Sequence, residues 1–195
     1  MESTTTGGGV RQDAPGDRTS EDRVEFRITG FGHPDARLLT AEVQQEYVRR
    51  YGEADLTELH PDHFEPPAGL FLIAYLDGAP VACGGWRAKQ AGPFGLRDGD
   101  AELKRMFVRP EARGRGLARA VLRRLERTAA EAGRTRFILE TGTEQPEAIA
   151  LYASEGYSAV EKFGLYREHE QSICLGKEFG GAEFGGAEFG GASAV

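Results

Sequence analysis

The sequence predicts a mixed α/β domain in which helices flank a central mixed sheet of about six to seven strands. Three observations predict it. Strand-like apolar or alternating runs recur along the chain, helical spacing of apolar residues separates several of them, and a glycine-containing turn joins one strand directly to a helix. A chain of 195 residues with these features is expected to form one domain with extensions at its ends.

The predicted elements come in the order strand, helix, three strands, helix, strand, helix and strand, with a short extra strand before the last one. Alternation in Val24-Glu-Phe-Arg-Ile indicates the first strand, and an apolar residue at every fourth position predicts a helix that ends at Gly52. Asp77-Gly78 between two apolar runs is a strong hairpin signal. The predicted ranges are 24–28, 39–51, 70–76, 81–87, 102–108, 117–132, 136–140, 145–155 and 172–175.

The fourth predicted strand has an irregular pattern. Strict alternation would put Arg105 between Leu103 and Phe107 on one face, and would mix charged and apolar residues on the other face as well. A half-buried strand avoids two mixed faces. We therefore predict a β-bulge at residues 104–106, which would re-aim one side chain.

The two ends of the chain differ from the domain in composition. Residues 1–23 are rich in Gly, Ser, Thr and Asp and are expected to be disordered. The sequence Glu-Phe-Gly-Gly-Ala begins at Glu178 and repeats from Glu183 and Glu188. Such a repeat predicts a flexible low-complexity tail over 178–195. The alternative is that the Phe residues of the tail bind a partner. The domain is expected to span 24–177.

Composition excludes several classes of function. The net charge of −7 argues against general nucleic-acid binding, and no apolar run reaches the ~18–20 residues of a membrane span. The N-terminus lacks the pattern of a signal peptide, and Cys83 and Cys174 lie apart in apolar contexts typical of reduced thiols, so a cytoplasmic protein is expected. His60 and His63 have no third ligand at a suitable spacing, so no metal is expected.

The turn after the fourth strand, Arg113-Gly-Arg-Gly-Leu-Ala118, has the character of a phosphate-binding loop. Two glycines at a strand-to-helix junction let backbone N–H groups approach an anion, and the helix dipole adds to the attraction. The third glycine of a Rossmann fingerprint is replaced by Arg119, and the Gly-Lys-Ser/Thr ending of a Walker loop is absent from the sequence.

This loop resembles the Gln/Arg-x-x-Gly-x-Gly/Ala signature of the GNAT superfamily of acyl-CoA-dependent N-acyltransferases. The stretch from Gln145 to Tyr157 resembles the fourth helix of that family, with Gln145 in place of the usual Asn. The resemblance covers roughly residues 24–177. The element order matches the family with one N-terminal helix fewer than is common, unless residues 57–64 form a short second one.

The resemblance implies acetyl-CoA as co-substrate and assigns residues to it. The fourth strand of the family carries a bulge and separates from the fifth, so the backbone of Met106, Phe107 and Val108 is expected to hydrogen-bond the pantetheine arm. The remaining expected contacts of acetyl-CoA are Arg113, Gly114, Arg115, Gly116, Leu117, Ala118 and Gln145.

Acetyl transfer to an amine requires the neutral amine, and about one alkylamine in 10³ is neutral at pH 7, so a general base is needed more than a general acid. Glu102 is the first candidate for the base by resemblance, and Glu140 at the end of the next strand is the second. Tyr152 occupies the Leu-Tyr position of the family and is expected to protonate the CoA thiolate. Candidate substrate-pocket residues are Trp86, Tyr166, His169 and, as the alternative to its role as base, Glu140.

The sequence thus predicts an acetyl-CoA-dependent N-acetyltransferase that acts on a primary amine of a small molecule by direct attack in a ternary complex, with a homodimer as the default assembly. A protein or peptide acetyltransferase and a CoA-binding module without turnover are the alternatives. An extended groove would favour the first alternative, and CoA affinity without thiol release would favour the second.

Overall fold

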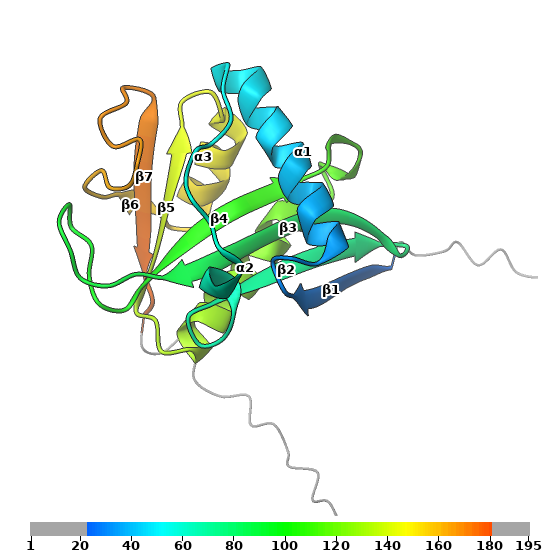
Figure 1. Cartoon of the computed structure of the whole chain (residues 1–195), viewed down its shortest axis with the longest axis horizontal. Coiled ribbons are helices and arrows are strands. Elements are labelled where there is room, and N and C mark those ends of the chain that lie inside the picture. Colours follow the sequence, from blue (N-terminus) through cyan, green and yellow to red (C-terminus); the bar gives the residue numbers. More distant parts are fainter. Residues whose placement is uncertain (1–22, 181–195) are drawn as a thin grey trace, which may run out of the picture.

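A computed structural model of the chain describes residues 23–180, which form one layered α/β unit (Figure 1). The predictions of disorder before residue 23 and of a flexible tail after residue 180 lie outside the described residues. Within these residues the strands form a seven-stranded mixed sheet in the order β1-β2-β3-β4-β5-β7-β6. The strands are β1 (Val24–Thr29), β2 (Gly69–Leu76), β3 (Ala79–Ala88), β4 (Asp100–Val108), β5 (Arg136–Gly142), β6 (Ser158–Ala159) and β7 (Ser172–Glu178).

Three α-helices accompany the described sheet: α1 (Pro34–Tyr51), α2 (Leu117–Glu131) and α3 (Pro146–Ser154). The predicted order of elements is confirmed, and a short 3-10 helix at Pro61–Phe64 occupies part of the loop in which a second N-terminal helix was considered. Helix α1 ends as predicted at Gly52, whose φ of 83° is a left-handed conformation that glycine adopts without steric cost. No helix among residues 23–180 is long and apolar enough to cross a bilayer.

The predicted bulge is present in β4. The register between β3 and β4 shifts between Cys83 and Gly85, and Arg105 takes a positive φ of 54° at that point. Leu103 before the shift and Met106 after it pack against the same hydrophobic cluster, although strict alternation would put them on opposite faces. The bulge therefore brings Leu103 and Met106 to the same side of the sheet, while Phe107 packs on the α1 side.

Strand β4 also separates from β5, as the resemblance implied. The two strands pair in parallel over three positions, the last joining Glu102 to Ile138, and the recorded pairing ends there. Beyond Glu102, β4 continues for six more residues to Val108 while β5 runs on to Gly142. The two strands therefore leave an opening in the middle of the sheet, as Figure 1 shows between the green and yellow arrows.

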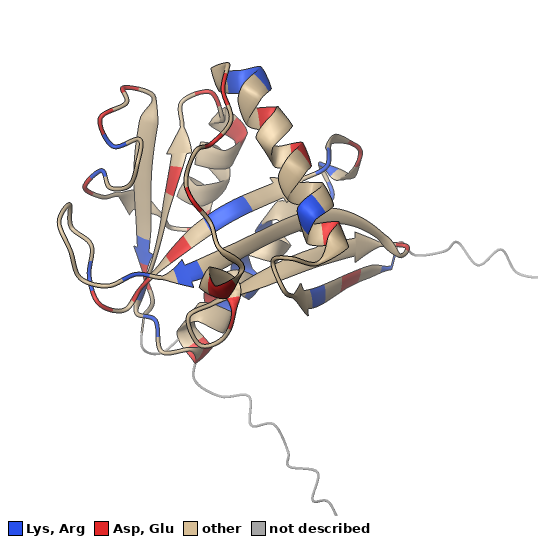
Figure 2. Ribbon diagram, viewed as in Figure 1, with Lys and Arg blue, Asp and Glu red and all other residues tan. Residues whose placement is uncertain are grey.

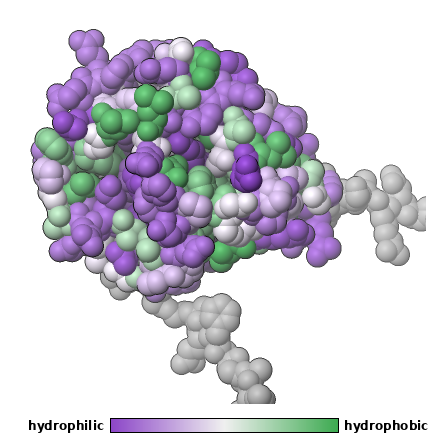
Figure 3. Space-filling view, in the orientation of Figure 1, coloured by the Kyte–Doolittle hydropathy of each residue, from purple (hydrophilic) through white to green (hydrophobic). Residues whose placement is uncertain are grey.

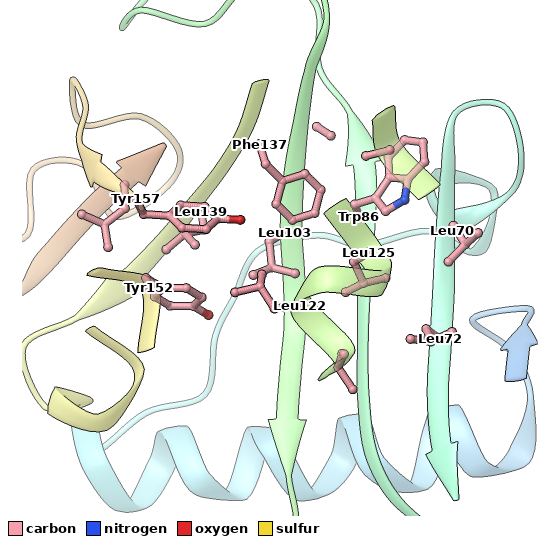
Figure 4. Packing of buried hydrophobic residues seen from close by; sticks show 14 of the residues in the cluster. Leu70, Leu72, Trp86, Leu103, Leu122, Leu125, Phe137, Leu139, Tyr152 and Tyr157 are labelled. Atoms are coloured by element: carbon pink, nitrogen blue, oxygen red, sulfur yellow. The ribbon is translucent and has the colours of Figure 1, made fainter. Parts of the chain in front are cut away.

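Two hydrophobic cores lie on the two faces of the sheet. The larger one joins α2 and α3 to the sheet through buried residues such as Leu122, Leu125 and Phe137, whose side chains converge in Figure 4. The smaller one packs α1 against the other face through Leu39 and Val43. These helices cover both faces and hold β4 and β5 in place at each side of the opening.

The last strand extends beyond the predicted end of the domain at residue 177. Strand β7 includes Glu178, whose carboxylate accepts a hydrogen bond from Arg97 at 2.7 Å. The ring of Phe179 lies 5.9 Å from that of Phe137, and its backbone N–H donates to Thr135. Glu178 and Phe179 are thus part of the folded unit, because Glu178 pairs with Arg136 of β5 and the ring of Phe179 packs against that of Phe137.

Candidate active site

A cavity of about 150 Å³ lies where β4 and β5 separate. Residues from α1, the loop after it, β4, β5, α3 and the segment before β7 line it. They are Tyr47, Tyr51, Glu53, Ala54, Asp55, Leu103, Lys104, Arg105, Met106, Leu139, Glu140, Thr141, Gly142, Gln145, Tyr152, Tyr166, His169, Gln171 and Ser172. Figure 3 shows that hydrophilic residues predominate on the molecular face seen in Figure 1, with apolar ones in small separate patches.

Glu140 is the candidate base that reaches the cavity. It lies near the C-terminal end of β5, and its carboxylate accepts a hydrogen bond from the Ser172 hydroxyl at 2.8 Å. Burial raises the pKa of Glu140 above its ordinary value, against the opposing effects of that hydrogen bond and of the Lys104 charge. A carboxylate with a raised pKa is a better proton acceptor near neutral pH than an ordinary glutamate.

Tyr152 lines the same cavity from α3, as the sequence predicted for the acid. Its side chain is 6% exposed, and its ring lies 5.5 Å from that of Tyr157 in the core (Figure 4). Burial raises the pKa of Tyr152, so the hydroxyl keeps its proton at physiological pH. The cavity thus brings together the carboxyl group of Glu140 from β5 and the hydroxyl group of Tyr152 from α3.

The structure argues against Glu102, the first candidate for the base. Its carboxylate is 1% exposed, is not among the residues that line the cavity, and is bound at 2.7 Å by Arg87 and at 2.8 Å by Lys104. A third cation, Lys89, lies 3.5 Å away. Burial alone would raise the pKa of Glu102, but these cations hold it at about 2. A carboxylate with so low a pKa is a poor proton acceptor, and this one is enclosed by its partners.

Trp86 is corrected as a substrate-pocket residue, whereas Tyr166 and His169 do line the cavity. Trp86 is 1% exposed in the core on the α2 side of the sheet, and its indole N–H donates to the Thr128 hydroxyl at 3.0 Å (Figure 4). Alternate residues of a strand face opposite sides of the sheet, and Trp86 lies on the side that α2 covers. The Tyr166 hydroxyl accepts a hydrogen bond from the backbone of Leu56 at 2.7 Å, which connects the two loops at the cavity.

The glycine loop leaves room for a ligand at the start of α2. Gly114 and Gly116 have φ values of 78° and 75°, and a methyl group built on either would meet no atom within 4 Å. Both positions therefore combine a conformation that other residues resist with open space beside the backbone. Leu117 and Ala118 begin the helix there, while the Arg113 side chain donates to the carbonyl of Val108 at 3.1 Å.

Two arginines of α2 next to the glycine loop are engaged in ion pairs. Arg119 and Arg123 both bind Glu155, which follows α3, at 2.7 Å. These ion pairs connect the two helices next to the glycine loop. Arg115 lies between Gly114 and Gly116 in the loop itself, before the first residue of α2.

The remaining predicted contacts of acetyl-CoA lie next to the opening. Met106 lines the cavity, and Phe107 and Val108 continue the segment of β4 beyond its pairing with β5. Gln145 precedes α3, lines the cavity and donates a hydrogen bond from its side chain to the Tyr51 hydroxyl at 3.1 Å. This region offers strand backbone, glycine backbone and a helix N-terminus, a set of groups that fits an extended ligand with an anionic end.

Sequence reasoning missed several polar residues of the cavity. Asp55 lies in a loop and forms an ion pair with Arg105 at the bulge, and this charge holds the pKa of Asp55 below its usual range although burial opposes it. From the sequence, Lys104 is one residue of an irregular strand and Ser172 is the first residue of the last strand, and neither pattern predicts a place in the site. The charged residue at the predicted bulge was the one signal in the sequence for any of them, since bulges often re-aim side chains at functional sites.

Comparisons with known proteins agree with this geometry. The model of the Acetyltransferase (GNAT) family matches residues 39–157. An IAA acetyltransferase of Azospirillum brasilense is 38% identical over 107 residues, which cover 55% of this chain and 66% of that protein.

Solved structures with 14–19% identity show the same fold. One is a ribosomal-protein-alanine N-acetyltransferase from Brucella melitensis, with a TM-score of 0.61, 19% identity and coverage of 80% of this chain and 99% of that one. Another is the PaiA N-acetyltransferase from Thermoplasma acidophilum in complex with coenzyme A, with a TM-score of 0.58, 14% identity and the same coverage of both chains.

Proposed function

The chain belongs to the GNAT family of acetyltransferases, and we propose that it transfers the acetyl group of acetyl-CoA to the primary amine of a small molecule. The observation that carries this proposal is the meeting of Glu140 and Tyr152 at one cavity, beside the unpaired part of β4. Acetyl-CoA supplies the acetyl thioester. Met106, Phe107, Val108, Gln145 and the loop from Arg113 to Ala118 would hold it.

Each of the two ionisable groups has one task. Glu140 takes the proton of the acceptor ammonium, directly or through a water, so that the nitrogen lone pair is free to attack the thioester carbonyl. As the carbon–nitrogen bond forms, the carbon–sulfur bond breaks, and Tyr152 donates its hydroxyl proton to the departing thiolate. The nitrogen then releases its second proton, which restores the Tyr152 hydroxyl. A backbone N–H at the bulge of β4 would polarise the carbonyl during attack.

Direct attack is supported by the state of the two cysteines. Cys83 is 0% exposed and Cys174 is 3% exposed, and burial raises the pKa of each thiol. Both thiols therefore stay protonated and enclosed, whereas a covalent route would need an accessible thiolate. A ternary complex of enzyme, acetyl-CoA and amine needs no such nucleophile.

The size of the cavity favours a small acceptor over a peptide. About 150 Å³ is below the ~300–1,000 Å³ of typical ligand pockets, while a peptide would need an extended groove. The relative from Azospirillum brasilense, named as an IAA acetyltransferase, also supports a small-molecule acceptor. Peptide acetylation remains the second candidate because GNAT enzymes such as the one from Brucella melitensis share the fold.

The test combines binding and turnover. Acetyl-CoA binding is measured by calorimetry, followed by thiol release over amino acids, monoamines, polyamines, aminoglycosides and peptides. We expect acetyl-CoA to bind and one class of small amine to release thiol, with release lost in Glu140→Gln while acetyl-CoA still binds. Well-folded protein that fails to bind acetyl-CoA would refute the proposal. Binding without release for any amine would favour the module without turnover.

A further inference from the structure

Two opposite charges face the opening between β4 and β5. The pairing of these strands ends with Glu102 beside Ile138, and continuing that register by two residues would bring Lys104 opposite Glu140. The strands separate before that point, and both residues line the cavity instead. Figure 2 shows the basic band of β4 and the acidic band of β5 on either side of the opening.

Lys104 keeps surplus positive charge although it has a partner. Its ammonium lies 2.8 Å from Glu102, but that carboxylate is shared with Arg87 at 2.7 Å and Lys89 at 3.5 Å. Three cations therefore surround one carboxylate, which leaves an excess of two positive charges in a protein with a net charge of −7. Of the three cations only Lys104 lines the cavity, and its side chain is 8% exposed.

The cavity is also lined by the carboxylates of Glu53, Asp55 and Glu140, and among the described residues none of these three forms an ion pair with Lys104. Asp55 forms an ion pair with Arg105, so its charge is already compensated. Glu140 is the carboxylate that faces Lys104, and its hydrogen bond comes from Ser172 rather than from a cation. Three buried or partly buried cations that share one carboxylate leave positive charge in excess, so a ligand that brings a second carboxylate to Lys104 gains affinity.

We propose that the acceptor carries a carboxylate next to its amine, as an amino acid does, and that Lys104 binds this carboxylate while Glu140 receives the proton of the amine. This inference rests on the function proposed above. The ligand carboxylate gains a charge-assisted hydrogen bond from Lys104, and the amine is thereby directed to the β5 side of the opening. A diamine of similar size would place a second ammonium against Lys104 and would be repelled.

The experiment compares matched acceptors in the full chain. Amino acids are tested against their carboxamides and their decarboxylated amines, and kcat/KM is measured by thiol release for each. We expect a preference for the carboxylate form of about tenfold or more, the usual effect of one hydrogen bond to a charged group. In Lys104→Met this ratio should fall to about one, while Lys104→Arg should retain most of it.

Lys89→Met is the matched control, because it removes a cation from the same carboxylate without changing the cavity lining. The ratio of kcat/KM between the carboxylate form and its matched amines should stay unchanged in this variant. In a separate measurement, calorimetry should show that the amino acid binds the CoA complex of the parent chain but not the CoA complex of Lys104→Met. Equal or faster acetylation of decarboxylated amines would overturn the inference and leave the proposed function intact. A preference that survives Lys104→Met would also overturn it. Acetylation of no amine at all would instead refute the proposed function and the inference with it.

Discussion

Replacing Glu102 by Gln should destabilise the fold more than it impairs the chemistry of the folded enzyme. The Glu102 carboxylate is held by Arg87, Lys89 and Lys104, and its side chain is 2% exposed. Its pKa lies at about 2 instead of 4.5, a difference of ~2.5 units. At 1.36 kcal/mol per unit, the ionised form contributes about 3 kcal/mol to stability at pH 7. Solvent screening is small at this degree of burial.

The pH dependence follows from the direction of this shift. Because the pKa of Glu102 is lower in the folded state than in the unfolded chain, its contribution is complete above about pH 5 and is lost as the pH falls toward 2. Glu102→Gln should therefore lower the free energy of unfolding by about 3 kcal/mol at pH 7. For a domain of this size that corresponds to a decrease in Tm of roughly 6–12 °C. The difference between the two proteins should narrow below about pH 4.5.

Urea unfolding at pH 7, 5 and 4 measures this difference, and kcat is determined on the folded fraction. Glu25→Gln is the stability control, because Glu25 pairs with Arg27 on the exposed strand β1 with 48% of its side chain accessible, and an exposed ion pair contributes little to stability. If Glu102→Gln kept its stability but lost kcat as severely as Glu140→Gln, the assignment of the base to Glu140 would be refuted and Glu102 would take that role.

Three further predictions concern the site. Because burial raises the pKa of Glu140, kcat should rise with pH with an apparent pKa above that of an ordinary glutamate. Glu140→Gln should abolish this rise and lower kcat by about 10²–10⁴-fold. A rise of kcat with pH that persists in the variant would contradict the assignment. Tyr152→Phe keeps the packed ring and loses only the proton donor. Because a thiol of pKa ~8.5 gives a thiolate that leaves without much help, kcat should fall less in this variant than in Glu140→Gln. Measuring kcat of the two variants side by side tests which group contributes more to the reaction. Gly116→Ala should weaken acetyl-CoA binding about tenfold, as measured by calorimetry. Gly133→Ala is the control: Gly133 follows the end of α2 and has a similar φ of 77° and similar open space beside it. This control variant should be less stable but should bind acetyl-CoA with unchanged affinity. Equal affinities of these two variants would exclude the glycine loop as the binding site.

The sequence by itself determined the order of the elements and the local backbone devices. The end of α1 at Gly52, the hairpin at Asp77-Gly78 and the glycine loop before α2 all follow from residues that adopt conformations other residues resist. The bulge in β4 was also predictable, because strict alternation would have mixed charged and apolar residues on both faces of the strand. Such signals act within a few residues, so a single chain displays them.

The tertiary structure alone decided which carboxylate lines the cavity and which is enclosed by cations. Glu102 and Glu140 are both acidic residues on neighbouring strands, and nothing near either of them in the sequence distinguishes them. Glu102 is enclosed because β3 brings Arg87 and Lys89 to it, whereas Glu140 lies past the point where β4 and β5 separate and so reaches the cavity. Protonation and access depend on charges and burial supplied by distant segments, and these are present only once the sheet has assembled.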